Sequence, residues 1–255
     1  MTTTKAALPG PDNPAEPRDT TLPPRAAAGS GTRPGHLRLV VGLLTFASGC
    51  GDVVALMALG GAFTSVITGN LIFVGRAVGT RSLSPALHAA IAVIGYMAGV
   101  AIGSMLTRFP GRSAPPTAAG SRRATTIFVA ECCVLVAVNA VWLGYHADPP
   151  TAVRDSLLTA MAGALGMQSA AARGLEGAPS TTYMTGALTN LVMALATGRW
   201  RQADPSAAIG LVALVAGAAC SAAIVTYARS AALLPPLVAL ALAVAVRARH
   251  ARTPD

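Results

Sequence analysis

Long apolar blocks with almost no charged residues are the feature that most limits how this chain can fold. Six of them are predicted to span a membrane, at 39–59, 85–106, 125–145, 157–172, 207–227 and 231–246. A helix needs about 20 apolar residues to cross a bilayer. Of all residues 53% are hydrophobic and 11% are charged, whereas soluble domains carry about 25% charged residues. The sequence therefore predicts an all-α bundle of transmembrane helices.

Two further apolar blocks are short and contain or follow glycine. The pair Gly60 and Gly61 ends the first long block, and the next block covers only residues 65–78. A second short block, at 181–196, follows the block at 157–172. Because glycine weakens a helix, we expect two short, broken segments beside about six full spans.

The stretch around the first short block has a weaker copy 117 positions later, where Thr68 falls on Thr185. Each of these threonines is followed by glycine and preceded by a broken helix. This combination is more specific than matches of single small residues. We therefore predict an internal repeat, with repeat one at 38–145 and repeat two at 152–248.

The distribution of arginine bears on the number of spans. The linker at 108–123 holds four Arg and no acid, whereas the connection at 146–155 holds two acids. Cytoplasmic loops are enriched in Arg and Lys. Six spans place the linker inside and the acidic connection outside, at the cost of leaving Arg76 and Arg81 outside. Each half then has three spans, so the halves are inverted copies, an arrangement found in many transporters.

Both ends of the chain are predicted to be cytoplasmic. Residues 1–37 form a Pro-rich, disordered tail, 38–248 the transmembrane domain and 249–255 a short basic tail. The net charge of +9 is explained by Arg residues beside apolar blocks, so nucleic acid is not expected as a partner. The expected partners are the lipid bilayer and an unknown small solute or ion. The sequence does not decide whether the protein forms a homo-oligomer. The four cysteines do not match zinc-site spacing, and we expect neither cofactor nor metal.

Several short motifs resemble those of the YoaK-like family of bacterial membrane proteins. They are Ser48-Gly49-Cys50-Gly51-Asp52, Gly60-Gly61, Thr68-Gly69-Asn70, Gly166-Met167-Gln168 and Thr185-Gly186. The resemblance covers about residues 38–248 and implies a multi-helix protein of the bacterial inner membrane, with no established substrate, catalytic residue or cofactor. In the second half Ser169 replaces the acid and Ala187 replaces the asparagine, so any site would be asymmetric.

Asp52 is the first candidate site residue. A carboxylate inside a span costs about 2.5–3.5 kcal/mol on insertion scales, which makes it a functional candidate for cation binding or proton relay. The alternative is a structural acid paired with backbone or with Arg76. Thr68, Gly69 and Asn70 open the short helix, whose N-terminal N–H groups suit an anion. Alternatively, Thr68 and Asn70 cap that helix or bond across the bundle.

Further candidates lie in other spans. Gln168 and Ser169 occupy the second-half positions of the acid motif, and Thr185 mirrors Thr68. If the halves meet at a midplane site, these residues face Asp52, and the alternative is hydrogen bonding between helices. Glu131 lies within the first two turns of its predicted span. A position at the helix start or the membrane interface is favoured there over solute or ion binding.

The predicted function is transport of a small solute across the bacterial plasma membrane, coupled to protons or cations through Asp52. The alternatives are a non-transporting scaffold or accessory protein and an intramembrane enzyme. The four histidines are scattered, and no Ser-His-Asp order, metal spacing or phosphate loop stands out. We therefore expect the protein not to be an enzyme.

Overall fold

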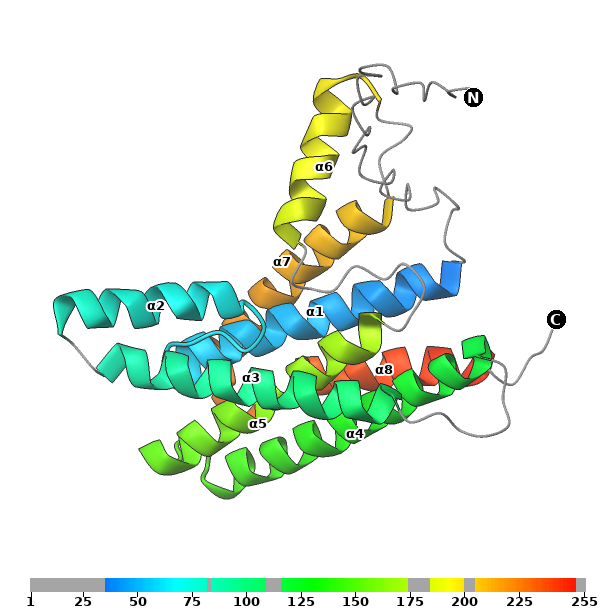
Figure 1. Cartoon of the computed structure of the whole chain (residues 1–255). Helices are drawn as coiled ribbons and strands as arrows, with labels where there is room; N and C mark the ends of the chain where they lie inside the picture. The colour runs from blue at the N-terminus through cyan, green and yellow to red at the C-terminus, as the bar shows by residue number, and fades with distance from the viewer. Residues whose placement is uncertain (1–34, 82–83, 109–115, 174–183, 200–204, 251–255) are drawn as a thin grey trace, which may run out of the picture. The chain divides into compact units, whose positions relative to one another are not determined.

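The computed structural model describes residues 35–81, 84–108, 116–173, 184–199 and 205–250 of the chain. All regular structure in these ranges is helical (Figure 1). The helices are α1 (Gly35–Ala58), α2 (Ile67–Thr80), α3 (Ser84–Arg108), α4 (Pro116–Gly144), α5 (Thr151–Arg173), α6 (Met184–Ala196), α7 (Pro205–Tyr227), the single 3₁₀ turn η3 (Arg229–Ala231) and α8 (Leu234–His250).

Six long helices, α1, α3, α4, α5, α7 and α8, run alternately between two ends of the bundle. At one end the rings of His36 and His250 stack with centroids 4.4 Å apart, which brings the start of α1 to the end of α8. We call this the His36 end. At the other end His88 Nε2, near the start of α3, lies 3.2 Å from Asp155 Oδ1, near the start of α5. We call this the His88 end.

Other contacts agree with this alternation. Arg247 Nε near the end of α8 donates to Thr125 Oγ1 near the start of α4, at 3.2 Å. At the His88 end, Trp142 Nε1 of α4 donates to the Arg229 carbonyl at 3.0 Å. Helices α1, α4 and α7 therefore run from the His36 end to the His88 end, and α3, α5 and α8 run back.

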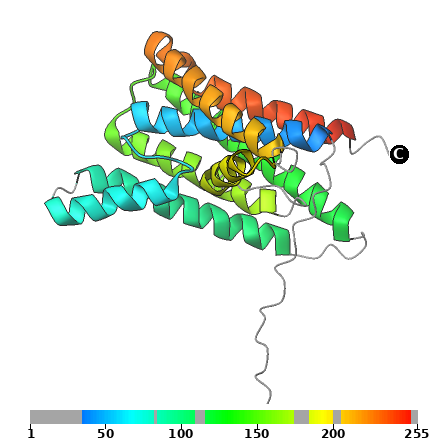
Figure 2. The ribbon, with the colours of Figure 1, turned by 90° about the horizontal axis from the view of Figure 1, so that it is seen from above.

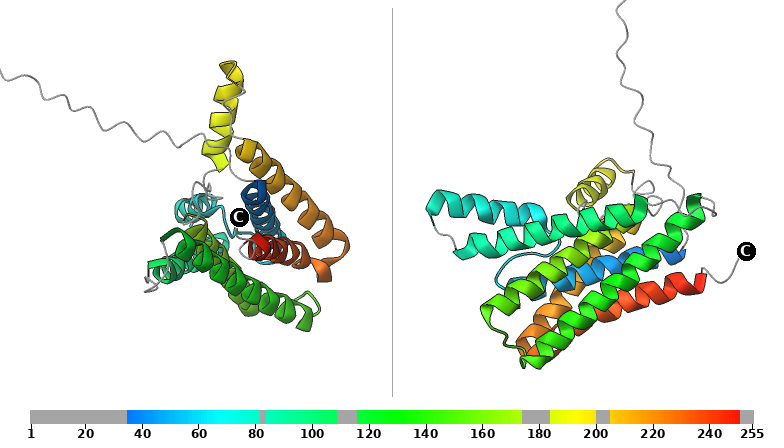
Figure 3. Two further views of the ribbon diagram at one scale, coloured as in Figure 1. Left: turned by 90° about the vertical axis from the view of Figure 1, so that its right-hand side faces the viewer. Right: turned by 60° about the horizontal axis from the view of Figure 1, so that its bottom comes forward.

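The innermost helices are α1 and α5. Helix α1 packs against α7 and α8, and α5 packs against α3 and α4. Helices α4 and α8 also contact each other (Figure 3). Many apolar side chains on α3, α7 and α8 stay exposed, including Ile94, Val212 and Leu242, and an exposed apolar surface of this kind suits contact with lipid.

Helix α3 meets α5 closely through three glycines spaced four residues apart, Gly95, Gly99 and Gly103. A Cβ on Gly99 would overlap the Gly163 carbonyl, and a Cβ on Gly95 would lie 2.8 Å from the Thr159 carbonyl oxygen, both on α5. Gly103 meets α5 again, beside Met167. Small residues let helix backbones approach each other closely, which is the main source of helix association in a bilayer.

Five of the described helices are long and apolar enough to cross a membrane, at Gly35–Ala58, Ala86–Thr107, Arg123–Gly144, Pro205–Tyr227 and Arg229–His250. Helix α5 has 23 residues, but it carries Arg154 and Asp155 in its first turns. Because α5 runs beside α3 from the His88 end to the His36 end, six helices pass between the two ends. The predicted polytopic helical bundle is confirmed.

Two predicted boundaries were wrong. Helix α4 begins at Pro116, inside the stretch at 108–123 that we predicted to be a polar linker. Proline is well tolerated in the first turn of a helix, where its missing N–H has no partner to lose. Helix α5 begins at Thr151, so Arg154 and Asp155 belong to the helix and not to the connection. The predicted tail at 1–37 lies outside the described residues up to residue 34, and α1 begins at Gly35.

The two short helices have fewer than the about 20 residues that a span needs. Helix α2 has 14 residues and packs against α3 (Figure 2), and α6 has 13 residues and packs against α7. Gly60 and Gly61 end α1 as predicted, with φ angles of 121° and 83°. Such angles are open to glycine and strained for other residues, and a Cβ on Gly60 would also overlap the His88 ring.

Candidate functional site

The segment between α1 and α2 turns back along α1 and meets Asp52. Asp52 lies six residues before Ala58, the last residue of α1, which is about 9 Å along the helix axis. Its Oδ1 accepts hydrogen bonds from the backbone N–H of Thr64 (2.7 Å) and of Ser65 (2.7 Å) and from the Thr64 hydroxyl (3.0 Å). Its Oδ2 accepts from the Ser65 hydroxyl at 2.6 Å.

This arrangement provides hydrogen-bond acceptors for backbone N–H groups of a non-helical segment that lies beside a membrane-spanning helix. Thr64 is fully buried and Ser65 is 6% exposed. Backbone N–H groups without partners are costly in a bilayer, where water cannot replace the missing hydrogen bond. The Asp52 carboxylate supplies the acceptors, so its contacts are those of a structural acid. We call Asp52, Thr64 and Ser65 the Asp52 loop cluster.

Asn70 also forms hydrogen bonds with the segment between α1 and α2. Its Oδ1 accepts from the Phe63 N–H at 2.9 Å, and its Nδ2 donates to the Phe63 carbonyl at 2.6 Å. The Asn70 side chain thus satisfies both backbone groups of one residue, and Asn70 is fully buried. These bonds lie within the α1–α2 segment and do not cross to another helix of the bundle.

The start of α2 offers fewer free N–H groups than predicted. Val66 occupies the N-cap position without a side-chain cap, and its carbonyl accepts from the N–H of both Gly69 and Asn70. Thr68 is exposed and does not occupy the cap position, so the capping role considered for it was wrong.

Arg76 is not the partner of Asp52. Arg76 is exposed, and its guanidinium carbon lies 6.0 Å from the centroid of the Phe73 ring on its own helix. Among the described residues, the hydrogen bonds to Asp52 come instead from Thr64 and Ser65.

A second buried polar cluster joins α1, α4 and α5. Gln168 Nε2 on α5 donates to Glu131 Oε1 on α4 at 3.0 Å, and the Ser48 hydroxyl on α1 donates to Gln168 Oε1 at 3.4 Å. Glu131 is 1% exposed, Gln168 2% and Ser48 fully buried. We call these three residues the Glu131 cluster. It forms near the middle of α1 and α4.

The position of Glu131 corrects the prediction. We placed it in the first two turns of its span, near the interface, whereas the helix begins 15 residues earlier, at Pro116, and Glu131 lies in the third turn of the candidate span that begins at Arg123. Its Oε2 atom is buried and has no hydrogen-bond partner among the described residues. Glu131 is therefore an interior acid with one hydrogen bond, where Asp52 has four.

The two remaining candidates lie apart from both clusters. Ser169 Oγ accepts from the Tyr96 hydroxyl of α3 at 2.9 Å, so Ser169 joins α3 to α5 and does not face Asp52. Thr185 is exposed on α6, and its carbonyl accepts from the Thr189 hydroxyl at 2.9 Å. The structure thus brings Gln168 and Glu131 together and leaves Thr185 outside this group.

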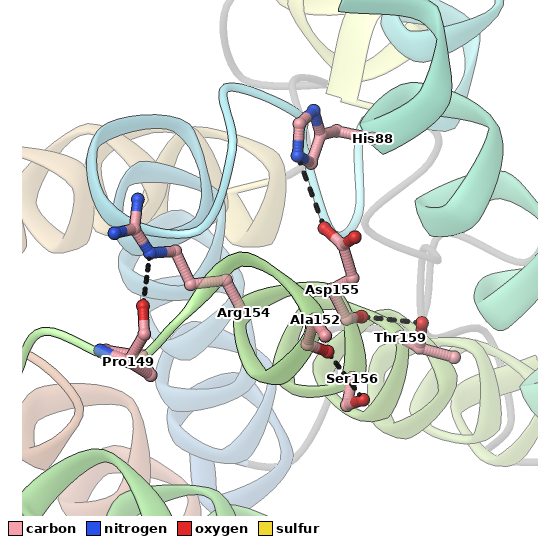
Figure 4. A network of polar contacts seen from close by, with 7 residues as sticks. All are labelled: His88, Pro149, Ala152, Arg154, Asp155, Ser156 and Thr159. Carbon is pink, nitrogen blue, oxygen red and sulfur yellow. Dashed lines mark hydrogen bonds and ion pairs between the residues drawn. The ribbon is translucent and has the colours of Figure 1, made fainter. Parts of the chain in front are cut away.

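Polar contacts also join helices at the His88 end (Figure 4). His88 and Asp155 face each other between α3 and α5, with side chains 18% and 22% exposed. Beside them Arg154 Nε donates to the Pro149 carbonyl at 2.7 Å, and Arg154 Nη2 lies 3.2 Å from Asp148 Oδ1. This network fixes the start of α5 to its neighbours. Within the described ranges no group of three or more His, Cys, Asp or Glu could hold a metal ion.

Sequence reasoning missed the partners of the candidate residues. Thr64, Ser65, Ser48 and Tyr96 were not predicted as site residues, although Ser48 belongs to the quoted acid motif. A signal for Ser48 is its position four residues before Asp52, which places both on one face of α1. Tyr96 and Ser169 are 73 positions apart in the sequence, and no local sequence pattern predicts their contact.

Alternating long helices and buried polar clusters define a polytopic helical membrane protein. The chain belongs to the family described as "Protein of unknown function (DUF1275)", whose sequence model matches residues 40–246. It is similar to UPF0700 transmembrane protein YoaK of Bacillus subtilis (strain 168), with 28% identity over 163 residues, 63% of this chain and 68% of the relative. No solved structure matches the chain. The YoaK-like resemblance is confirmed.

Proposed function

We propose that this protein is a small-solute transporter of the bacterial plasma membrane, built from two inverted repeats. The observation that carries the proposal is reciprocal packing. Helix α1 packs against α7 and α8, and its counterpart α5 packs against α3 and α4, the counterparts of α7 and α8. Counterparts run in opposite directions between the two ends, and inverted repeats of this kind are a common transporter design.

Glycine contacts support the same correspondence. Gly49 and Gly166 are 117 positions apart. A Cβ on Gly49 would overlap the Leu214 carbonyl of α7, and a Cβ on Gly166 would overlap the Tyr96 carbonyl of α3. A Cβ on Gly217 of α7 would overlap the Phe46 carbonyl of α1, just as a Cβ on Gly99 of α3 would overlap the Gly163 carbonyl of α5. Phe46 and Gly163 are again 117 positions apart. The α1–α7 pair and the α5–α3 pair therefore pack through close backbone contacts at corresponding positions.

The position of the Glu131 cluster also favours transport. Ser48 and Glu131 belong to the first half and Gln168 to the second, so the cluster bridges the halves. Substrate and ion sites of inverted-repeat transporters lie near the midplane between the repeats. The coupling group of this proposal is thus a buried acid, as predicted, but its contacts favour Glu131 over Asp52.

We assign the His36 end to the cytoplasm. It carries the ends of the Arg-rich stretch between α3 and α4 and the Arg residues of the last turn of α8, whereas Asp148 and Asp155 lie at the His88 end. This distribution follows the positive-inside rule. A single cysteine placed at residue 112 should react with a membrane-impermeant maleimide from the cytoplasmic side, and one at 148 from the outside.

Counterflow in proteoliposomes tests transport directly. Vesicles preloaded with one solute class at a time, namely amino acids, sugars, organic acids or small amines, receive the labelled solute outside. We expect protein-dependent accumulation for at least one class. The matched control is Gly75→Ala, because a Cβ there meets nothing within 4 Å, and this variant should transport like the wild type. Folded protein with no counterflow for any class would contradict transport and favour a scaffold.

A further inference from the structure

The Glu131 cluster contains an interior acid whose surroundings are incomplete. Glu131 Oε1 receives one hydrogen bond, from Gln168, and Oε2 receives none from the described residues. The ion pairs within the described ranges, His88 with Asp155 and Arg154 with Asp148, do not involve Glu131. An uncompensated carboxylate inside a membrane protein is costly. The carboxyl group must therefore be neutralised by something that it binds.

We infer that Glu131 is the exchangeable proton site of the protein, with Gln168 and Ser48 as its hydrogen-bond relay. This inference rests on the proposed transport function and names its coupling ion. The donor set favours a proton over a divalent metal. One carboxylate, one amide and one hydroxyl are too few for the six or more oxygen ligands that Ca²⁺ and Mg²⁺ take. A proton needs only one oxygen atom.

The relay can run in either direction. As the atoms are placed, Ser48 donates to Gln168, and Gln168 donates to Glu131, which suits a proton-free carboxylate. A half-turn of the amide exchanges its oxygen and nitrogen, and a serine hydroxyl both donates and accepts. In the protonated state, Glu131 O–H donates to Gln168 Oε1, and Gln168 Nε2 donates to Ser48 Oγ. Every member of the chain keeps a partner in both states.

Loss of the proton affects the two carboxyl oxygens differently. When the O–H bond breaks and the proton passes to water, Oε1 regains the Gln168 amide as a donor. Oε2 then carries charge with no donor among the described residues. The proton-free carboxylate is therefore disfavoured in this packed conformation. It favours a different conformation of the protein, in which water reaches Oε2. This difference between states is what couples a proton to a conformational change.

The charged and titratable groups on the elements packed around Glu131 do not replace the proton. They include Arg247 on α8, Tyr96 on α3, Cys50 and Asp52 on α1, Cys132 and Cys133 on α4, and Arg154 and Asp155 at the far end of α5. Arg247 Nε donates to Thr125 Oγ1, and its guanidinium carbon lies 5.7 Å from the Phe128 ring centroid. Asp52 is held by the Asp52 loop cluster.

Infrared difference spectroscopy between acid and alkaline pH, on protein in lipid nanodiscs, tests the inference. We expect a protonated-carboxyl carbonyl band that disappears reversibly as pH rises. The band should be lost in Glu131→Gln and kept in Asp52→Asn. Glu131→Asp retains a carboxyl group and should keep a shifted band, which guards against misfolding of the Gln variant. Ser48→Ala, which removes the far end of the relay, should shift the titration midpoint of the band.

Each outcome separates the inference from the transport proposal. A wild-type protein without a pH-dependent carboxyl band, or with one that Glu131→Gln leaves unchanged, overturns the proton site even if counterflow is observed. A band that Glu131→Gln removes supports the proton site even if counterflow fails for every solute class, in which case only transport is overturned.

Discussion

The Asp52 loop cluster and the Glu131 cluster both contain a buried acid within an apolar block, but their surroundings differ. Asp52 is 5% exposed and accepts four hydrogen bonds from two residues of one re-entering segment. Glu131 is 1% exposed and accepts one, from a different half of the chain. Burial alone therefore does not distinguish the two acids, whereas the number of hydrogen-bond donors around each carboxyl group does.

The difference also concerns what each acid holds together. Asp52 ties α1 to the segment that follows it, so its bonds are local in sequence. Glu131 lies in a chain of contacts spanning α4, α5 and α1, with sequence separations of 37 and 120 positions. The contacts of Glu131 thus join helices from both halves of the chain, and those of Asp52 hold one loop.

The largest expected effect on stability comes from Asp52→Ala. This change leaves two buried backbone N–H groups and two hydroxyls without acceptors, and each unsatisfied buried group costs about 1–3 kcal/mol. We expect a loss of about 4 kcal/mol or more in the free energy of unfolding, measured by SDS titration in bicelles. Asp52→Asn keeps one acceptor oxygen and should lose less. A stability of Asp52→Ala equal to the wild type would contradict the structural role.

Asn70→Ala should have the next largest effect. It removes both hydrogen bonds to Phe63 at a fully buried position, at a cost of about 1–3 kcal/mol. Hydrogen exchange of the Phe63 amide should speed up in this variant while that of α4 stays unchanged. Equal acceleration in both places would mean that Asn70 supports the whole bundle and not the loop alone.

Gly51→Ala should have a smaller effect that depends on the same loop. A Cβ on Gly51 would lie 3.3 Å from Thr64 Oγ1 and 3.5 Å from Leu165 Cδ1, and crowding of this kind costs about 1 kcal/mol or more. Gly75→Ala is the matched control, since its Cβ meets nothing within 4 Å and alanine favours a helix by about 1 kcal/mol. Because Gly51 also lies inside a helix, crowding offsets the same gain there, and the free energy of unfolding of Gly51→Ala should be lower than that of Gly75→Ala.

Glu131→Gln should have the smallest effect on stability. Its amide is the neutral isostere of the protonated acid and keeps an oxygen that accepts from Gln168. We expect the thermal unfolding midpoint in detergent to stay the same or to rise slightly. A loss as large as that of Asp52→Ala would show that Glu131 is a structural carboxylate, and the contrast between the two clusters would fail.

The helical bundle was largely predictable from the sequence because each of its signals is local. Apolar blocks of membrane length predicted the spans, and the Gly60-Gly61 pair predicted the end of α1. The start of α4 was not predictable in this way, because Pro116 follows another proline in a polar, Arg-containing stretch that resembles a loop. That error displaced Glu131 from the helix interior to the interface.

The candidate site was predictable as a set of residue types but not as a set of partners. Intramembrane acids stand out in an apolar sequence, so Asp52 and Glu131 were both found. The return of the α1–α2 segment onto Asp52 depends on tertiary packing, and the pairing of Ser48 with Gln168 depends on how two distant helices meet. Neither has a signal at a fixed sequence spacing.

The number of protons released on unfolding tests the central claim most directly. Wild-type protein, Glu131→Gln and Asp52→Asn are each unfolded by guanidinium in weakly buffered solution at neutral pH, where exposed carboxyl groups are ionised. If Glu131 holds a proton in the folded state, the wild type should release about one proton more than Glu131→Gln. Asp52→Asn should release as many as the wild type. Equal release from the wild type and Glu131→Gln would contradict the account.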